Sequence, residues 1–230
     1  MITGAPLLLA GSGVVGDPYF ANVSLLMHMD GADNGTTFTD VTGKTITRVN
    51  SILTKTAIKQ FGSASCYCIP GAWLNIGAAT DFAFGIGDFT IEFWLYYVST
   101  TANAASMTKR NPSSIGAGAW GITASGSAIY WKDTLHGGAD KAVTGLVDKT
   151  NAWRHIAISR SSGVLKIFAD GVEGYSGAST INYTNSYTLG VTKWDVSSYT
   201  TCYIDELRIT TGVGRYTSNF TPSLIAHPDF

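Results

Sequence analysis

Strict alternation of apolar and polar residues is the feature that most limits what this chain can fold into. The segment 89–95 reads Phe-Thr-Ile-Glu-Phe-Trp-Leu, and a β-strand places every second side chain on the same face. Four apolar side chains therefore share one face: Phe89, Ile91, Phe93 and Leu95. Similar alternation recurs along the chain, while helical periodicity is nearly absent. The pattern predicts an all-β fold.

Turn residues between the alternating segments indicate how the strands connect. Segments 154–160 and 164–169 are separated by Ser-Ser-Gly, and the second ends at Asp170-Gly171, a dipeptide typical of hairpins. Strands joined in this way, without helical crossovers, predict two stacked antiparallel sheets. A chain of 230 residues suits a jelly-roll β-sandwich better than a small immunoglobulin sandwich.

The segment 203–209 alternates as well, but its pattern includes acids. A regular strand places Asp205, Leu207 and Ile209 on one face and the even-numbered residues on the other. We therefore expect the core face of this strand to begin with an acid.

The two ends of the chain lack the alternating pattern. Residues 1–20 contain several glycines and no strand pattern, which predicts an extended N-terminal arm that serves for attachment rather than as part of the sandwich. Residues 21–222 are expected to form one sandwich domain, since all-β domains of this length commonly fold as one unit. Residues 223–230 are expected to form an extended tail. The stretches 99–150 and 183–201 are expected to be loop-rich and to contact partners.

The charge balance argues against several classes of partner. The chain has 15 Lys+Arg and 16 Asp+Glu, a formal net charge of -1, and no basic run, so we expect no nucleic-acid binding. The apolar run at 6–10 is too short to span a membrane and follows no basic residue, so we expect neither membrane insertion nor a signal peptide.

The cysteines and histidines form no recognisable metal or catalytic pattern. Cys66, Cys68 and Cys202 are too few for a disulfide framework, and a zinc site would lack a fourth ligand, so buried reduced thiols are expected. The histidines have neither metal-binding nor triad spacing and are predicted to be structural: His28, His136, His155 and His227.

A family pattern appears when several segments are taken in order. They include Leu-Met-His-Met-Asp-Gly at 26–31, Phe-Thr-Asp at 38–40, 60–69, 88–95, 153–160, 165–171 and 204–209. Together they resemble the laminin-G-like members of the concanavalin-A-like jelly-roll superfamily. The ending, 204–210 followed by Gly-Arg-Tyr-Thr-Ser-Asn-Phe-Thr-Pro at 214–222, is similar to a variant of this family frequent in bacteriophage virion proteins. The resemblance implies the sheet topology and a binding role, and fold alone defines no ligand.

The resemblance also implies a metal. Laminin-G-like domains often hold a calcium ion with acids and backbone carbonyls, and calcium accepts such oxygen ligands at flexible geometry. The site would include Asp30 or Asp205, each at the edge of an apolar strand, where an unpaired carboxylate is costly. The alternative is that these carboxylates accept hydrogen bonds from backbone N–H groups and organise turns.

Aromatic residues with polar neighbours are the candidates for ligand binding. Tyr130, Trp131 and Trp194 lie in predicted loops or strand ends, and their ring faces suit the apolar face of a sugar. Asp133 and His136 would supply hydrogen bonds beside them. The alternative is that these rings close one end of the sandwich or are buried against a partner subunit.

Catalysis is not expected, although glycoside hydrolases share the superfamily fold. Retaining enzymes hold two carboxyls about 5 to 5.5 Å apart, and neither Glu92 nor the adjacent acids Asp205 and Glu206 supply such a pair on one strand face. We expect a non-enzymatic surface protein of a bacteriophage virion, made in the host cytoplasm and placed on the head or tail. It would dock on other virion proteins, self-associate and adhere to host glycan. The alternative is a free or host-attached lectin.

Overall fold

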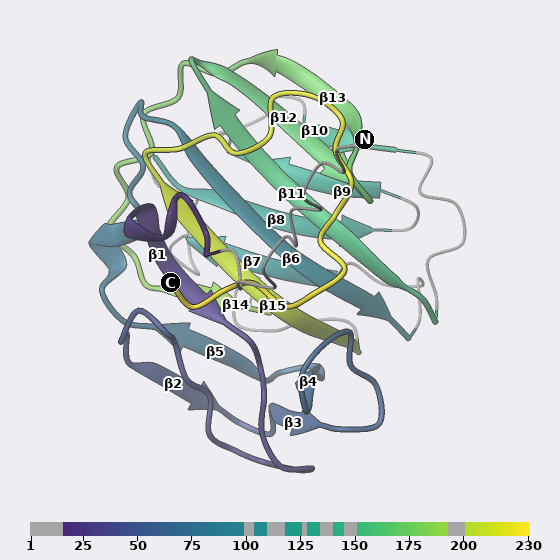
Figure 1. Cartoon of the computed structure of the whole chain (residues 1–230). Coiled ribbons are helices and arrows are strands. Elements are labelled where there is room, and N and C mark those ends of the chain that lie inside the picture. Colours follow the sequence, from purple (N-terminus) through teal and green to yellow (C-terminus); the bar gives the residue numbers. More distant parts are fainter. Residues whose placement is uncertain are drawn as a thin grey trace, which may run out of the picture.

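The fold is a sandwich of two antiparallel β-sheets, as the sequence predicts (Figure 1). The structure is a computed structural model that describes residues 16–98, 104–109, 118–125, 128–133, 140–144, 151–192 and 201–230. Residues 1–15, most of the predicted arm, lie outside the described ranges, and so do His136 and Trp194.

Sheet A has eight strands. In spatial order they are β13 (Val172–Ala178), β12 (Val164–Ala169), β11 (Trp153–Ser161), β6 (Phe89–Tyr97), β15 (Cys202–Thr211), β4 (Ser65–Cys68) and β3 (Leu53–Lys55), with β1 (Val23–Met27) also paired to β15. The strands β11, β12 and β13 are consecutive antiparallel neighbours, which confirms the two predicted hairpins.

Sheet B has seven strands. In spatial order they are β10 (Lys141–Val143), β9 (Ala128–Lys132), β8 (Trp120–Ser125), β7 (Ala104–Lys109), β14 (Leu189–Val191), β5 (Trp73–Ile76) and β2 (Ile46–Val49). Two short 3-10 helices, η1 (Phe20–Asn22) and η2 (Ala79–Phe82), complete the described elements. None of the described helices is long and apolar enough to cross a membrane.

The core lies between the sheets and confirms the alternation predicted for 89–95. Phe89, Ile91, Phe93 and Leu95 are buried in one cluster with side chains from both sheets. The three cysteines are free thiols, and all of them are buried in this cluster. Burial of this much apolar surface is the main stabilising contribution to such a domain.

Strand β15 departs from the predicted alternation. A bulge between Asp205 and Arg208 shifts its register against β6, and Glu206 adopts a left-handed backbone conformation with φ 50°. The extra residue places Ile204, rather than Asp205, in the core cluster together with Leu207 and Ile209. The expectation that the core face begins with an acid is therefore wrong, because a β-bulge reverses the sides of the residues that precede it.

The stretch 99–150 was expected to be loop-rich, yet its described parts form the four strands β7 to β10 of sheet B. Met107, Trp120 and Ile122 on these strands are buried in the core. Strand β8 does alternate, reading Trp-Gly-Ile-Thr-Ala-Ser, but the glycines around it obscure the pattern. Glycine disfavours strands in isolation, and tertiary packing overrides that preference here.

Residues 212–230 form a C-terminal strap that crosses the outer face of sheet A (Figure 1). The ring of Phe220 stacks on that of Tyr216 at a centroid distance of 3.7 Å, and Phe220 N donates to Gly171 O at 2.9 Å. Gly171 has φ 77°, and a Cβ there would lie 1.9 Å from Phe220 O. Gly171 is therefore required in this hairpin turn for two reasons: its backbone conformation and the close approach of the strap.

The described end of the predicted arm lies against the sandwich. Asp17 is buried, and its backbone N donates to Phe230 O at 2.7 Å. The two ends of the described chain therefore lie side by side on sheet A.

Candidate functional site

Among the predicted ligand-binding residues, Trp131 is placed differently from the expectation. It belongs to β9 and is completely buried. Its ring stacks against Trp120 and Phe89 at centroid distances of 5.3 and 5.6 Å, and Nε1 donates to Asp133 Oδ2 at 3.0 Å. Because both neighbours are core rings, no face of Trp131 is left for a sugar. The structure therefore places Trp131 in the interior of the sandwich rather than in a surface loop.

Asp133 supports this interior cluster. It accepts a hydrogen bond from the Tyr183 hydroxyl at 2.7 Å and forms an ion pair with Lys141. Burial and the nearby carboxylate raise the pKa of Tyr183 above its ordinary value, so the hydroxyl stays a donor. Tyr130, by contrast, is half-buried on the other face of β9, with Lys132 Nζ 5.2 Å from its ring centroid. The structure therefore separates Tyr130 from Trp131 and Asp133.

Asp30 and Asp205 both bind the loop 60–64. Asp205 Oδ2 accepts hydrogen bonds from Gln60 N at 2.8 Å and Phe61 N at 3.1 Å, and its Oδ1 accepts one from Glu206 N at 2.9 Å. Asp30 Oδ1 accepts hydrogen bonds from Ser63 N and from Ala64 N. Burial raises the pKa of Asp205 to about 7, although the N–H donors oppose this shift.

The contacts of Asp205 do not fit a calcium ion. Three backbone N–H groups point at the Asp205 oxygens, and a cation at the same oxygens would face the positive ends of those dipoles. In the part of the chain that the structure describes, no three acids, histidines or cysteines gather as metal ligands. The geometry supports the alternative prediction, in which the two carboxylates organise a turn.

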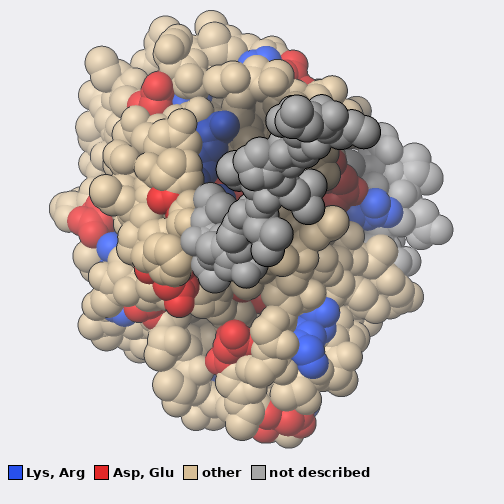
Figure 2. Space-filling model, viewed as in Figure 1, with Lys and Arg blue, Asp and Glu red and all other residues tan. Residues whose placement is uncertain are grey.

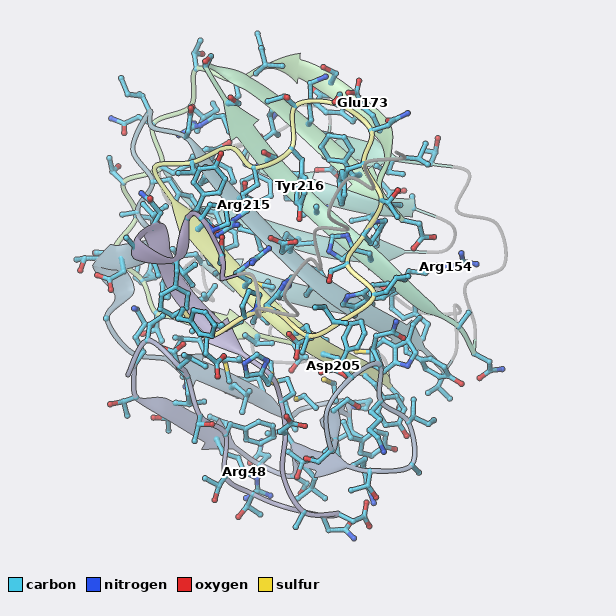
Figure 3. The ribbon with its side chains drawn as sticks, viewed as in Figure 1. Arg48, Arg154, Glu173, Asp205, Arg215 and Tyr216 are labelled. Atoms are coloured by element: carbon cyan, nitrogen blue, oxygen red, sulfur yellow. The ribbon has the colours of Figure 1, made fainter. Side chains whose placement is uncertain are left out.

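A charged cluster lies on the outer face of sheet A beneath the strap. It consists of Asp17, Glu92, Arg208 and Arg215. Figure 3 labels Arg215, the member of the cluster that the strap contributes. Arg208 donates to Glu92 Oε1 from Nε and Nη2 at 2.9 and 2.7 Å, and from Nη1 to Asp17 Oδ2 at 2.9 Å. Arg215 on the strap donates to both Asp17 oxygens.

The strap completes the shielding of Glu92. The Tyr216 hydroxyl donates to Glu92 Oε2 at 2.6 Å, and His155 Nε2 lies 3.3 Å from the same oxygen. Burial alone would raise the pKa of Glu92, but the Arg208 guanidinium and the His155 hydrogen bond hold it well below its usual range. A fully buried, ionised and paired carboxylate cannot reach a substrate, so Glu92 is structural.

Beyond the charged cluster, sheet A carries four aromatic side chains in register on adjacent strands. Tyr67 on β4 lies opposite Tyr203 on β15, Tyr203 lies opposite Tyr96 on β6, and Tyr96 lies opposite Trp153 on β11. The centroid distances along this aromatic row are 4.9, 5.8 and 5.5 Å. All four rings are half-buried, so part of each remains in contact with solvent.

Alternation explains why the aromatic row faces outward. The three tyrosines neighbour core residues on their own strands, such as Cys66 and Cys68 beside Tyr67, and therefore point to the opposite face. Trp153 shares its face of β11 with His155, which lies against Glu92 on the outer side of the sheet. Cross-strand aromatic pairs also stabilise the sheet. The row thus has a structural role, but rings that stay half-exposed keep apolar surface that no described part of the chain covers.

Polar groups border the aromatic row. The Tyr96 hydroxyl donates to Asn151 Oδ1 at 3.4 Å, and Lys55 Nζ lies 5.9 Å from the Tyr67 ring centroid. Burial, followed by the Tyr67 and Tyr96 hydroxyls, raises the pKa of Tyr203, so its phenol stays protonated at neutral pH. Apolar ring faces combined with hydroxyl donors and acceptors are the groups that bind sugars.

Sequence reasoning missed this row although a signal was present. Tyr67, Tyr96, Trp153 and Tyr203 are aromatic residues on the outward positions of strands, where short polar residues are usual. Their assembly depends on the register of four strands that are distant in sequence, and the sequence does not give that register.

Comparisons with known structures agree with the sandwich fold. The binding domain of botulinum neurotoxin DC, solved in complex with SialylT, superimposes with a TM-score of 0.63 at 13% identity, covering 85% of this chain and 49% of that one. The receptor-binding domain of botulinum neurotoxin type G gives 0.59 at 15% identity, covering 86% and 48%. The chain thus spans about half the length of these structures, and at such low identity the likeness shows the fold alone. A search of curated proteins found no match.

The sequence itself places the chain in a family. Residues 72–213 match the Laminin G 3 family, described as the concanavalin A-like lectin/glucanases superfamily. This match covers more than half of the chain. The protein belongs to that family, which confirms the laminin-G-like resemblance.

Proposed function

We propose that this protein is a non-catalytic binding module that recognises glycan through the aromatic row. The observation that carries the proposal is the row itself: four half-exposed rings in register on adjacent strands, bordered by hydroxyl, amide and ammonium groups. Its family is described as a superfamily of lectins and glucanases, and one structural neighbour was solved in complex with SialylT, which supports a sugar as the ligand.

The acids that sequence reasoning considered for catalysis have other tasks, which supports a non-catalytic role. Glu92 is paired with Arg208, Asp205 holds the loop 60–64, and Glu206 accepts hydrogen bonds from His28 and from the backbone of His227. Acid–base catalysis of glycoside hydrolysis needs carboxyls that reach the scissile bond. These three carboxylates are instead engaged in the contacts just described, which favours a binding role.

We place the module on the surface of a bacteriophage particle, as a head decoration or tail-associated protein that adheres to host glycan. The support is the resemblance of 204–210 and 214–222 to virion proteins of this family. A surface with small, scattered groups of both charges suits contact with neutral sugar and with neighbouring subunits (Figure 2). Mass spectrometry of purified particles tests this placement. If the protein is absent from the particles, the free lectin becomes the better proposal.

Glycan-array binding of variants tests the site. The double variant Tyr96→Ala/Tyr203→Ala should lose affinity about tenfold or more, equivalent to roughly 1.4 kcal/mol, because both central rings are removed. Tyr130→Ala is the matched control, a half-buried tyrosine on sheet B that should bind like the wild type. Thermal melts must show that each variant is folded. The proposal fails if Tyr130→Ala weakens binding and the row variant does not.

A further inference from the structure

We infer that the aromatic row takes a single soluble polysaccharide chain, several sugar units long, that lies across the strands. The inference rests on the proposed function and adds the class of ligand. It excludes two other carbohydrate ligands, a lone terminal sugar and the flat face of a crystalline polysaccharide.

The length of the row sets the length of the ligand. Its rings come from the four adjacent strands β4, β15, β6 and β11. Neighbouring strands lie about 4.8 Å apart, so the outermost strands of the row are roughly 14 Å apart. One sugar ring can stack on one aromatic ring, so a ligand that contacts the whole row has several units.

The orientation of the rings sets the shape of the ligand. Interplanar angles along the row are 38° between Tyr67 and Tyr203, 88° between Tyr203 and Tyr96, and 58° between Tyr96 and Trp153. Rings turned this far from one another do not form a plane, so a flat crystalline face could contact only part of the row. A single chain can rotate at each glycosidic bond and present a different face to each aromatic ring.

The position of the row determines which part of the ligand the protein recognises. The rings stand on the outer face of a sheet and therefore contact a ligand from one side. Such contacts repeat along a chain and do not depend on its end. Affinity should therefore rise with the number of units until the row is filled, in contrast to a pocket for a terminal sugar, where the first unit supplies most of the affinity.

Affinity electrophoresis of the full chain in gels that contain laminarin, dextran, xylan, hydroxyethyl cellulose or hyaluronan identifies a binding polymer. Calorimetry then uses fragments of that polymer, from the monosaccharide to the hexasaccharide. Affinity should rise at least about tenfold between the disaccharide and the tetrasaccharide. Pull-down with crystalline cellulose and crystalline chitin should recover no more protein than a plain agarose bead.

Variants at the two ends of the row sharpen the test. Tyr67→Ala and Trp153→Ala should each weaken binding of the hexasaccharide and leave the disaccharide nearly unchanged, because a short fragment can use the remaining rings. Tyr130→Ala should change neither. Equal affinity for the monosaccharide and the hexasaccharide, or retention on the crystalline solids, overturns the inference while the proposed function stands. If no polymer retards the protein, or if Tyr96→Ala/Tyr203→Ala binds as the wild type does, both the proposed function and this inference are contradicted.

Discussion

The outer face of sheet A has two halves that are built from the same strands and treated in opposite ways. Strand β6 carries Glu92 in one half and Tyr96 in the other, and β15 carries Arg208 and Tyr203. The strap covers the charged half, while the aromatic row is left half-exposed. Trp94 lies between Glu92 and Tyr96 on β6, and Phe61 of the loop 60–64 contacts its ring at a centroid distance of 5.8 Å.

The difference teaches which surface the chain closes for itself. Buried charges are costly unless each is paired, so the strap must bring Arg215 and Tyr216 to saturate Asp17 and Glu92. Aromatic rings carry no such requirement and tolerate partial exposure. Described parts of the chain cover the charged half, which is costly to expose, and leave the aromatic half partly exposed.

The largest expected effect comes from breaking the charged half. Arg208→Met leaves Glu92 and Asp17 buried without their shared partner, and should lower the free energy of unfolding by about 3–5 kcal/mol in urea titrations. The double variant Glu92→Leu/Arg208→Met should recover part of that loss, because it removes both charges. A loss below about 1 kcal/mol in Arg208→Met would show that the cluster does not hold the strap.

A smaller effect is expected at the loop between the halves. Asp205→Ala removes the acceptor for Gln60 N and Phe61 N and should cost about 1–3 kcal/mol. Chelators should not change the melting temperature of the wild type, since the carboxylate binds backbone N–H groups. If chelator lowers the melting temperature of the wild type but not that of Asp205→Ala, a calcium ion bound by Asp205 would be supported instead.

The attachment of the strap should depend on pH, and the aromatic row should not. Hydrogen bonds to Glu206 and Asp229, at 2.7 Å each, raise the pKa of His28 to about 9 against the effect of burial. A histidine whose pKa rises on folding contributes its full stabilisation below the unfolded pKa near 6.5, and this contribution is lost as the pH rises through 9.

Unfolding measured between pH 7 and 9 in the wild type and in His28→Asn checks this dependence; the comparison is needed because Asp205, with a pKa of about 7, and Lys109, with a pKa of about 8, also change charge in this interval. Stability should fall by roughly 1–2 kcal/mol across the interval. The slope should be flatter in His28→Asn. An equal slope in this variant would assign the dependence to other groups, and glycan affinity should stay constant throughout.

The smallest effect concerns the end of the row at β3. Lys55 Nζ donates to the neutral Asn34 Oδ1 at 2.6 Å, and no described carboxylate forms an ion pair with it. Lys55→Gln should therefore weaken binding of an acidic polysaccharide about twofold to threefold at low salt, and leave a neutral one unchanged. Calorimetry at low and high salt checks this, and an equal effect on both polymers would mean that Lys55 acts by packing on Tyr67.

The strands of the core could be predicted because their periodicity is local. Segment 89–95 specifies its own buried face, and Asp170-Gly171 specifies its hairpin. The bulge at Glu206 could not be predicted, since its cause is distant: Glu206 binds His28 on the chain beside β1 and the backbone of His227 on the strap. Such contacts offset the cost of a left-handed backbone in a residue other than glycine.

The candidate site shows the same limit more strongly. Trp131 is a ligand-binding candidate in the sequence because its segment has the pattern of a loop or strand end with polar neighbours, yet Trp120 and Phe89, which bury it, come from other strands. Tyr67 and Tyr203 are far apart in sequence and meet only through the register of β4 and β15. Local patterns identify which face a side chain takes, and pairing between distant strands decides what it meets there.

Asp17 N donates to Phe230 O, so the first and last described parts of the chain are adjacent, and this determines how the described domain carries mechanical load. A force applied at residue 17 or at residue 230 pulls on the same corner of sheet A. Tension on the C-terminal end would peel the strap contact by contact, first at Asp229 and His227 and later at Tyr216. Tension on the other end acts on Asp17, which both arginines hold at once. Under such a load the strap would therefore detach before the strands of the sandwich separate. The strands that carry the aromatic row would then stay paired.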